Sequence, residues 1–153
     1  MEIRKATLSD CDAIAKLIEE LAIKFIVHEF SEFGKNQFLS SNDQERIAEF
    51  MNHGFEYHVA VGKNKIVGVV GMRENSHLYH LLVSEEHQGK GLSRELWELA
   101  KNKCLSKGNP GKFTVNSSNN AVGVYEAFGF KRTSAMEESN GVLYNPMLLE
   151  INS

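Results

Sequence analysis

The alternation of apolar and polar residues at the start of the chain predicts a short strand followed by a helix. Residues 2–6 alternate in character, as in a strand with one buried face. Ser9, with Asp12 three residues later, resembles a capping box that opens a helix. Apolar side chains then recur at the helical period and mark one buried face: Ile14, Leu17, Ile18, Leu21 and Phe25.

Residues 26–42 lose the helical period and carry three aromatic side chains together with His28 and Glu29. The pattern predicts an irregular segment, a loop that packs its aromatic side chains on the core. Beyond it, Asn42 or Asp43 can cap a second helix.

The middle of the chain predicts three strands and a long helix. The second helix ends near Asn52, and residues 55–61 and 66–72 then predict two strands joined by a hairpin turn at 62–65. Residues 78–83 predict a third strand. The long helix that follows has a buried side marked by Leu92, Leu96, Leu99 and Cys104, with Trp97 beside it.

The last third of the chain predicts shorter elements. Glycines and a proline at residues 107–111 end the long helix. In order, we expect a strand at 113–115, a short helix at 119–128 closed by Gly129, and two final strands at 130–133 and 142–151 joined by a polar tip at 137–141.

Length and composition favour one domain, residues 1–153, because 153 residues with 42% hydrophobic content can bury a substantial core. The net charge of −3, without a Lys/Arg-rich run, makes nucleic acid and anionic membranes poor partners. No apolar run approaches the roughly 18–20 residues of a membrane span, and the N-terminus lacks a signal-peptide core. Cys11 and Cys104 lie in helical apolar patterns, which predicts buried, reduced thiols in a cytoplasmic protein.

Residues 76–94 carry the strongest functional signal: an apolar strand, the loop Gln88-Gly-Lys-Gly-Leu-Ser93 and the start of the long helix. The first N–H groups of a helix lack intrahelical partners and the helix dipole adds positive charge, so this order makes an anion site. Gly89 and Gly91 let the backbone approach a phosphate closely. A P-loop pattern fails at two positions, and a dinucleotide fingerprint needs a third glycine where Arg94 stands.

The loop resembles the Gln/Arg-x-x-Gly-x-Gly/Ala pyrophosphate loop of the GNAT superfamily of N-acetyltransferases, with Ser93 in place of the last Gly or Ala. For so short a match, an ordinary strand–turn–helix is the alternative. A second stretch supports the resemblance. The GNAT strand is matched by Phe113-Thr-Val-Asn116, the short helix by Ala121 and Tyr125, and the Leu/Phe-Gly-Phe that follows by Phe128-Gly-Phe130. The two stretches cover about residues 76–134, and the other predicted elements follow the family's order.

The resemblance implies a fold of the α/β class with mixed α+β character. Its central mixed sheet would contain about seven mostly antiparallel strands, with helices on both faces and one splayed pair of parallel strands at 78–83 and 113–116. Acetyl-CoA would be the co-substrate, with its pantetheine arm between the splayed strands, and no metal would take part. The implied cofactor contacts are Leu81, Leu82, Val83, Gln88, Gly89, Lys90, Gly91, Leu92, Ser93, Arg94, Asn116, Ala121 and Tyr125.

Tyr125 matches the family tyrosine that sits near the thioester sulfur, which makes it the candidate acid for the departing thiolate. A phenol with a pKa of about 10 still carries its proton at neutral pH. The alternative is a helix tyrosine that packs on the sheet.

His77 is the candidate general base, because some family members place histidines upstream on this strand. A strand histidine that only makes a hydrogen bond is the alternative, as are Glu74 or Glu29 as base and an amine that arrives deprotonated. The two-residue period of a strand predicts two faces. One face carries His77, Tyr79, Leu81 and Val83, and the other carries His80 and Leu82.

The acceptor amine is not identified by the sequence, because this fold serves many substrates. The resemblance suggests an acceptor wall that includes Phe25, His28, Glu29 and Tyr79. The leading hypothesis is direct acetyl transfer from acetyl-CoA to an amine of a small molecule or a peptide. A non-catalytic acyl-CoA sensor and an adapter that docks a protein at residues 26–42 are the alternatives. Dimers are common among similar proteins, so a homodimer fits the resemblance.

Overall fold

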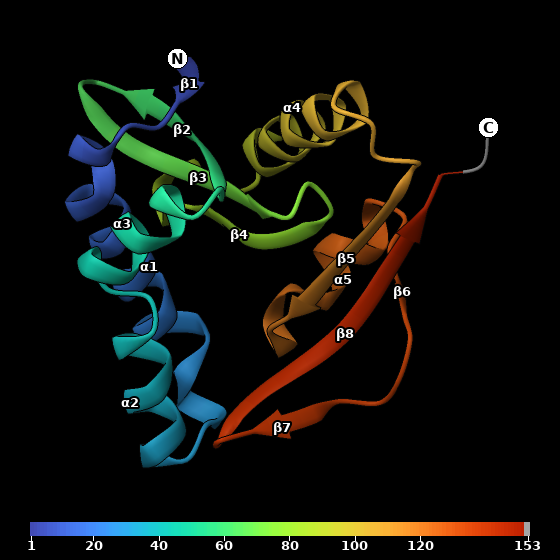
Figure 1. The fold of residues 1–153 in the computed structure, drawn as a ribbon. Helices are drawn as coiled ribbons and strands as arrows, with labels where there is room; N and C mark the ends of the chain where they lie inside the picture. Colours follow the sequence, from blue (N-terminus) through green and yellow to red (C-terminus); the bar gives the residue numbers. More distant parts are fainter. Residues whose placement is uncertain (152–153) are drawn as a thin grey trace.

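The computed structural model describes residues 1–151 and is organised around one sheet (Figure 1). Among these residues the sheet has eight strands in the order β1-β2-β3-β4-β5-β8-β6, and β7 pairs with β8. The strands are β1 (Glu2–Lys5), β2 (Glu56–Gly62), β3 (Lys65–Arg73), β4 (His77–Val83), β5 (Lys112–Ser117), β6 (Lys131–Arg132), β7 (Glu137–Ser139) and β8 (Val142–Glu150).

Helices cover both faces of this sheet. Figure 1 shows α1, α2 and α3 together on one side and α4 on the other. The helices are α1 (Cys11–Phe25), α2 (Glu32–Ser40), α3 (Gln44–Asn52), α4 (Leu92–Ser106) and α5 (Val122–Ala127), and the short 3₁₀ turns are η1 (Leu8–Asp10), η2 (Val27–Glu29), η3 (Glu85–His87) and η4 (Asn119–Ala121).

The sheet is antiparallel except at β4 and β5, which run parallel. Only His77 with Thr114 and Leu78 with Val115 are paired across these two strands. Beyond these rungs the strands diverge, so backbone groups on the facing edges are left without partners in the sheet. The predicted mixed sheet with a splayed parallel pair is therefore confirmed, with eight strands instead of about seven because part of the predicted polar tip forms β7.

Two apolar cores hold the layers together. One lies between the sheet and α4 with α5, and the other lies between the sheet and α1 with α3. Cys11 and Cys104 are buried free thiols, as predicted. Trp97 is fully buried, not peripheral, whereas Leu99 is only half-buried, so the inward face of α4 is rotated slightly from the predicted one.

Three local predictions need correction. The capping interaction before α1 is made by Thr7, whose backbone N–H donates to Asp10 Oδ2 at 2.8 Å, and not by Ser9 with Asp12. The segment 26–42 is not irregular throughout, because Ser31 accepts a hydrogen bond from the Gly34 N–H and caps α2. The helical period was hidden there because α2 lies mostly at the surface and buries only Gly34 fully.

A β-bulge at Tyr79 changes the predicted faces of β4. The register with β3 pairs Gly71 with His80 and Met72 with Leu78, so Tyr79 has no partner. The prediction that one face carries His77 and Tyr79 together with Leu81 and Val83 is wrong, because one extra residue shifts the two-residue period. The observed faces are Leu78, Leu81 and Val83 toward α4, and His77, Tyr79, His80 and Leu82 toward α1 and α3.

Gly71 is required beside this bulge because it makes room for a buried ring. A Cβ at this position would lie 2.2 Å from Cε1 of Tyr57, which is itself only 2% exposed. We expect Gly71→Ala to lower the free energy of unfolding by about 2–3 kcal/mol, as overpacked core substitutions do. Chemical denaturation measures this loss.

Gly123 in α5 provides the matched control, because a Cβ there would meet nothing within 4 Å. Replacing a helical glycine by alanine removes backbone entropy from the unfolded chain, so Gly123→Ala is expected to add roughly 0.5–1 kcal/mol. Equal stability of the Gly71→Ala variant and the natural protein would contradict the packing argument.

Candidate active site

A cleft of about 660 Å³ opens where β4 and β5 separate. It extends from the glycine loop before α4, past β4 and α5, to the α1–α2 segment and the start of β8. Most of the predicted site residues line it: Phe25, His77, Tyr79, Leu81, Leu82, Val83, Gln88, Gly89, Gly91, Leu92, Ser93, Asn116, Ala121 and Tyr125. Those that do not line it are His28, Glu29, Lys90 and Arg94.

The glycine loop presents free backbone N–H groups to one end of the cleft. The Glu95 N–H donates to the Gly91 carbonyl at 3.0 Å, so the N–H groups before it have no acceptor within α4. No side chain caps this helix. The Gln88 side chain donates to the Val83 carbonyl at 3.0 Å and ties the loop to the end of β4.

Both loop glycines have backbone angles that other residues rarely adopt. Gly89 has φ of +76° and Gly91 has φ of +82°. A Cβ on either residue would meet no protein atom within 4 Å, so the space in front of both is empty. The loop therefore fits a pyrophosphate, with an open cradle, unpaired N–H groups and the positive end of the α4 dipole.

Two charged residues that were predicted to contact the cofactor, Lys90 and Arg94, do not line the cleft. Lys90 is exposed outside the cleft. The Arg94 guanidinium lies 5.0 Å from the centre of the Phe128 ring and donates to the Ala127 carbonyl at 3.3 Å. Arg94 thus joins α4 to α5, and the backbone amides are the stronger candidates for phosphate contacts.

Tyr125 lies in the wall of the cleft on α5. Its ring packs edge-on against Phe128 and Phe130, and the residue is 7% exposed. Tyr57 and Tyr144 use their hydroxyls in hydrogen bonds, whereas the Tyr125 hydroxyl has no such partner among residues 1–151. Burial raises the pKa of Tyr125 above its ordinary value, so the hydroxyl keeps its proton at every physiological pH.

His77 lies at the first of the two paired rungs between β4 and β5, one residue before the last rung at Leu78. Its Nδ1 is 2.7 Å from Thr114 Oγ1, which joins β4 to β5 through side chains as well as backbone. Burial, helped by the charge of Arg73, lowers the pKa of His77 to about 4. The imidazole is therefore neutral at pH 7 and is a weak base, and its contacts give it a structural partner at the mouth of the splay.

His80 occupies a buried network that the sequence did not suggest. The Asn42 side-chain N–H donates to the Phe38 carbonyl at 2.7 Å, so its Oδ1 faces His80 Nε2, 2.7 Å away, as an acceptor. With the proton on Nε2, His80 Nδ1 accepts the hydroxyl of Tyr57 at 2.9 Å. The network joins α2, β2 and β4, and burial lowers the pKa of His80 to about 3.

The acceptor end of the cleft has an aromatic wall. Phe25 and Phe30 line it from the α1–α2 segment, and Phe38 lines it from α2, with its ring 6.0 Å from that of Phe30. His28 and Glu29, predicted for this wall, are exposed and lie outside it. The aromatic residues of segment 26–42 were the signal that could have identified Phe30 and Phe38.

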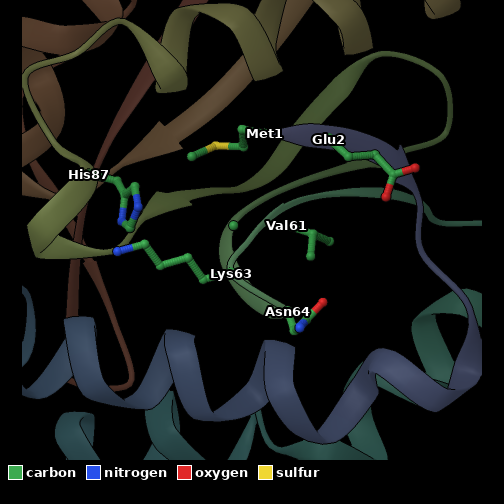
Figure 2. Close-up of a pocket in the computed structure, with 7 residues that line it drawn as sticks. Met1, Glu2, Val61, Lys63, Asn64 and His87 are labelled. Atoms are coloured by element: carbon green, nitrogen blue, oxygen red, sulfur yellow. The ribbon is translucent and has the colours of Figure 1, made fainter.

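A second hollow of about 510 Å³ lies where the β2–β3 turn meets the N-terminus (Figure 2). Figure 2 shows Lys63 extending toward the ring of His87, a residue that also lines the larger cleft. The hollow contains none of the predicted site residues. We therefore place the candidate site in the larger cleft.

Two searches of the described part of the chain were negative. Among residues 1–151, no three His, Cys, Asp or Glu side chains gather closely enough to hold a metal ion. No helix within the same residues has the length and apolar character needed to cross a membrane.

Comparison with known proteins gives a family match. A family model described as "Acetyltransferase (GNAT) domain" matches residues 26–151. No curated protein matches the chain. Many solved structures resemble it, and their low identities support the fold alone.

Three of these structures illustrate the likeness. A GCN5-related N-acetyltransferase from Rhodopseudomonas palustris is 17% identical with a TM-score of 0.81, covering 98% of this chain and 95% of its own. PaiA N-acetyltransferase from Thermoplasma acidophilum, solved in complex with coenzyme A, is 17% identical with a TM-score of 0.80, covering 98% of each chain. An aminoglycoside 6′-acetyltransferase type Ii is 17% identical with a TM-score of 0.70, covering 100% of this chain and 99% of its own.

Proposed function

The chain belongs to the GNAT family of acetyltransferases, and from this premise we propose that it transfers the acetyl group of acetyl-CoA directly to an amine. One observation carries the proposal: a single cleft brings together an open glycine loop, the edges of two splayed strands and the hydroxyl of Tyr125. These are an anion cradle, unpaired backbone groups and a proton donor, which are what acetyl transfer from a thioester to an amine requires.

The residues of β4 and the loop would hold acetyl-CoA along this cleft. The free N–H groups from Gly89 to Ser93 suit its pyrophosphate, and the edge of β4 from Leu81 to Val83 that has no pairing with β5 suits its pantetheine arm. Asn116 and Ala121 line the opposite wall. Acetyl-CoA supplies the thioester carbon that accepts the amine nitrogen, and the thiolate that leaves.

We assign Tyr125 as the acid that protonates the departing thiolate. Tyr125 lines the cleft, its hydroxyl has no hydrogen-bond partner among residues 1–151, and its raised pKa keeps the proton in place. His77 has a pKa of about 4, so its imidazole is neutral in the resting protein, and we assign it no proton-transfer step. The amine reacts in its neutral form, and its proton passes to water.

Ser93→Asp tests the cradle without harming the fold. Ser93 is the second residue of α4, where a carboxylate interacts favourably with the helix dipole, but its charge would repel a pyrophosphate. We expect the variant to bind acetyl-CoA at least about 100-fold more weakly, since like charges in contact cost several kcal/mol. Thermal stability in a titration of acetyl-CoA measures the binding, because a ligand of the folded state raises it.

Ser9→Asp is the matched control, because it adds the same charge at an exposed helix start outside the cleft. It should bind acetyl-CoA as the natural protein does. Release of free thiol with a panel of primary amines then tests transfer itself. Failure of the natural protein to bind acetyl-CoA would refute the proposal, and binding without transfer to any amine would favour the acyl-CoA sensor.

A further inference from the structure

The acceptor end of the cleft is lined by aromatic and aliphatic side chains. Phe30 and Phe38 form one side, and Leu143 and Tyr144 of β8 belong to the same lining. The bulged Tyr79 contributes a further ring, held edge-on by Phe50 and Phe55 at 5.2 Å. The polar groups at this end are uncharged: the amides and hydroxyls of Gln37, Ser41, Asn42, Ser139 and Asn140, and the neutral imidazoles of His77 and His80.

No Asp, Glu, Lys or Arg side chain lines the cleft within residues 1–151. The acid closest in sequence to the aromatic wall, Glu29, lies outside it and accepts a hydrogen bond from Asn119 at 3.0 Å. Arg73 also lies outside the lining, with its guanidinium 5.7 Å from the centre of the Tyr79 ring. Glu137 lies outside the lining as well, and its carboxylate accepts a hydrogen bond from the Tyr144 hydroxyl at 3.3 Å. A second charge on an acceptor would therefore lose hydration without meeting a charged side chain in the lining.

Residues 25–40, from the end of α1 through α2, contribute to the lining of the cleft and contact the rest of the protein at two further points. At one point, Asn119 of η4 donates a hydrogen bond to Glu29 of η2. The other is the contact of two backbones: a Cβ on Gly34 would lie 2.0 Å from the Gly141 oxygen, so α2 touches the β7–β8 turn. These bridges frame the aromatic end and limit the room for an extended chain.

We propose that the acceptor is a small primary amine carried on an aromatic or apolar body, with no second charge. This inference rests on the proposed acetyl transfer and names its substrate class. Burial of an aromatic body against Phe30 and Phe38 supplies the binding free energy. The uncharged lining favours the neutral form of the amine, which is the form that reacts.

The chemistry balances within this assignment. The amine nitrogen forms a bond to the thioester carbon, the carbon–sulfur bond breaks, and the products are the N-acetyl amine and coenzyme A. The amine loses one proton to water, and the thiolate takes one from Tyr125, which regains it from solvent. No oxidant, metal or further reactant is needed.

Binding of three amines to the protein loaded with coenzyme A tests the class without requiring turnover. The probes are phenethylamine, 1,5-diaminopentane, which has a second ammonium in place of the ring, and phenylalanine, which adds a carboxylate to the carbon that carries the amine. We expect phenethylamine to bind at least about tenfold more tightly than either, because each added charge would be buried without a partner. With acetyl-CoA, kcat/KM should follow the same order.

Phe30→Asp is the variant that should change the preference. Phe30 lines the cleft, is half-buried and lies outside both cores, so the fold should tolerate the change. The new carboxylate is expected to lower the ratio of phenethylamine to 1,5-diaminopentane affinity by about tenfold or more. Phe33→Asp is the control, since Phe33 is on the first turn of α2, is 61% exposed and does not line the cleft.

The outcomes separate this inference from the proposed function. Acetyl transfer that favours the diamine, the amino acid or a peptide N-terminus would overturn the inference and leave the acetyltransferase standing. Absence of phenethylamine binding to the coenzyme A complex would also overturn it. A protein that does not bind acetyl-CoA would instead refute the proposed function, and equal effects of Phe30→Asp and Phe33→Asp would refute the role of the aromatic wall.

Discussion

Tyr125→Phe is expected to lower kcat by about 100-fold, near the lower limit for loss of a general acid. The lower limit applies because a thiolate is a fair leaving group, so protonation assists its departure but is not essential. The ring and its contacts with Phe128 and Phe130 stay, so the fold and the cleft should be unchanged. The KM for acetyl-CoA should therefore change little, and steady-state kinetics with free-thiol detection measures both parameters.

Tyr144→Phe is the matched control for this prediction. Tyr144 lines the same cleft, but its hydroxyl donates to Glu137 Oε1 at 3.3 Å. Phenylalanine keeps the ring that Tyr144 contributes to the acceptor end, so loss of this exposed hydrogen bond is expected to affect the KM for the amine and to leave kcat nearly unchanged. If Tyr125→Phe kept most of its kcat, or if both variants lost the same share, Tyr125 would have no special role as a proton donor.

The pH dependence gives a second readout of the same residue. Burial raises the pKa of Tyr125, so its proton-donating form persists above pH 10. Activity should therefore rise with pH as more of the amine becomes neutral, without a fall that reports loss of the phenol proton below pH 10. A descending limb centred between pH 8 and 9, absent from Tyr125→Phe, would contradict the assigned pKa shift.

Local signals predicted the parts of the site that are contiguous in the chain. The loop from Gln88 to Ser93 and the helix carrying Tyr125 are positioned by glycines and short-range hydrogen bonds, and these are visible in a few residues. The order of the strands followed from the family resemblance, since period and propensity alone do not fix which strands pair.

Features made by distant contacts could not be predicted in this way. Asn42 or Asp43 was expected to cap the second helix, and Asp43 caps α3 through the Arg46 N–H. Asn42 instead binds His80, which lies 38 residues away, and nothing in the sequence indicated this contact. The bulge at Tyr79 depends on how β3 and β4 align, and this alignment is not contained in the two-residue period of one strand. The surface helix α2 has a weak apolar face, so its period did not stand out.

The buried histidines predict a strong loss of stability in mild acid. The pKa values of His77 and His80 are about 4 and about 3 in the folded protein, because burial disfavours the charged form. In the unfolded chain a histidine titrates near pH 6.5, so below this pH the unfolded state binds protons that the folded state does not. The stability contributed by neutral burial is therefore complete above about pH 6.5 and is lost as the pH falls toward 4.

The expected loss between pH 7 and pH 4 is on the order of 5 kcal/mol, at 1.36 kcal/mol for each unit of pKa difference. This is comparable to the whole stability of many domains, so we expect acid unfolding between about pH 4 and pH 5. Asp10 adds to the loss only at lower pH, because its hydrogen bond from Arg4 holds the pKa of its carboxyl below the usual value.

His80→Gln isolates the contribution of the buried network. Glutamine does not titrate, so the slope of unfolding free energy against pH should fall by about one proton between pH 6 and pH 4.5. The variant will also lose stability at pH 7, because its hydrogen bonds to Tyr57 and Asn42 are disturbed, but the slope is independent of that offset. Urea denaturation at a series of pH values measures the slope.

His53→Gln is the control, because His53 is an exposed residue that follows α3. Its replacement removes one histidine and leaves the buried histidines in place. Its slope should match that of the natural protein. An unchanged slope in His80→Gln would mean that His80 takes up its proton in the folded state, in which case the network from Tyr57 to Asn42 would have to open below pH 6. An unchanged slope together with retained folding at pH 4 would contradict the neutral burial of His80 altogether.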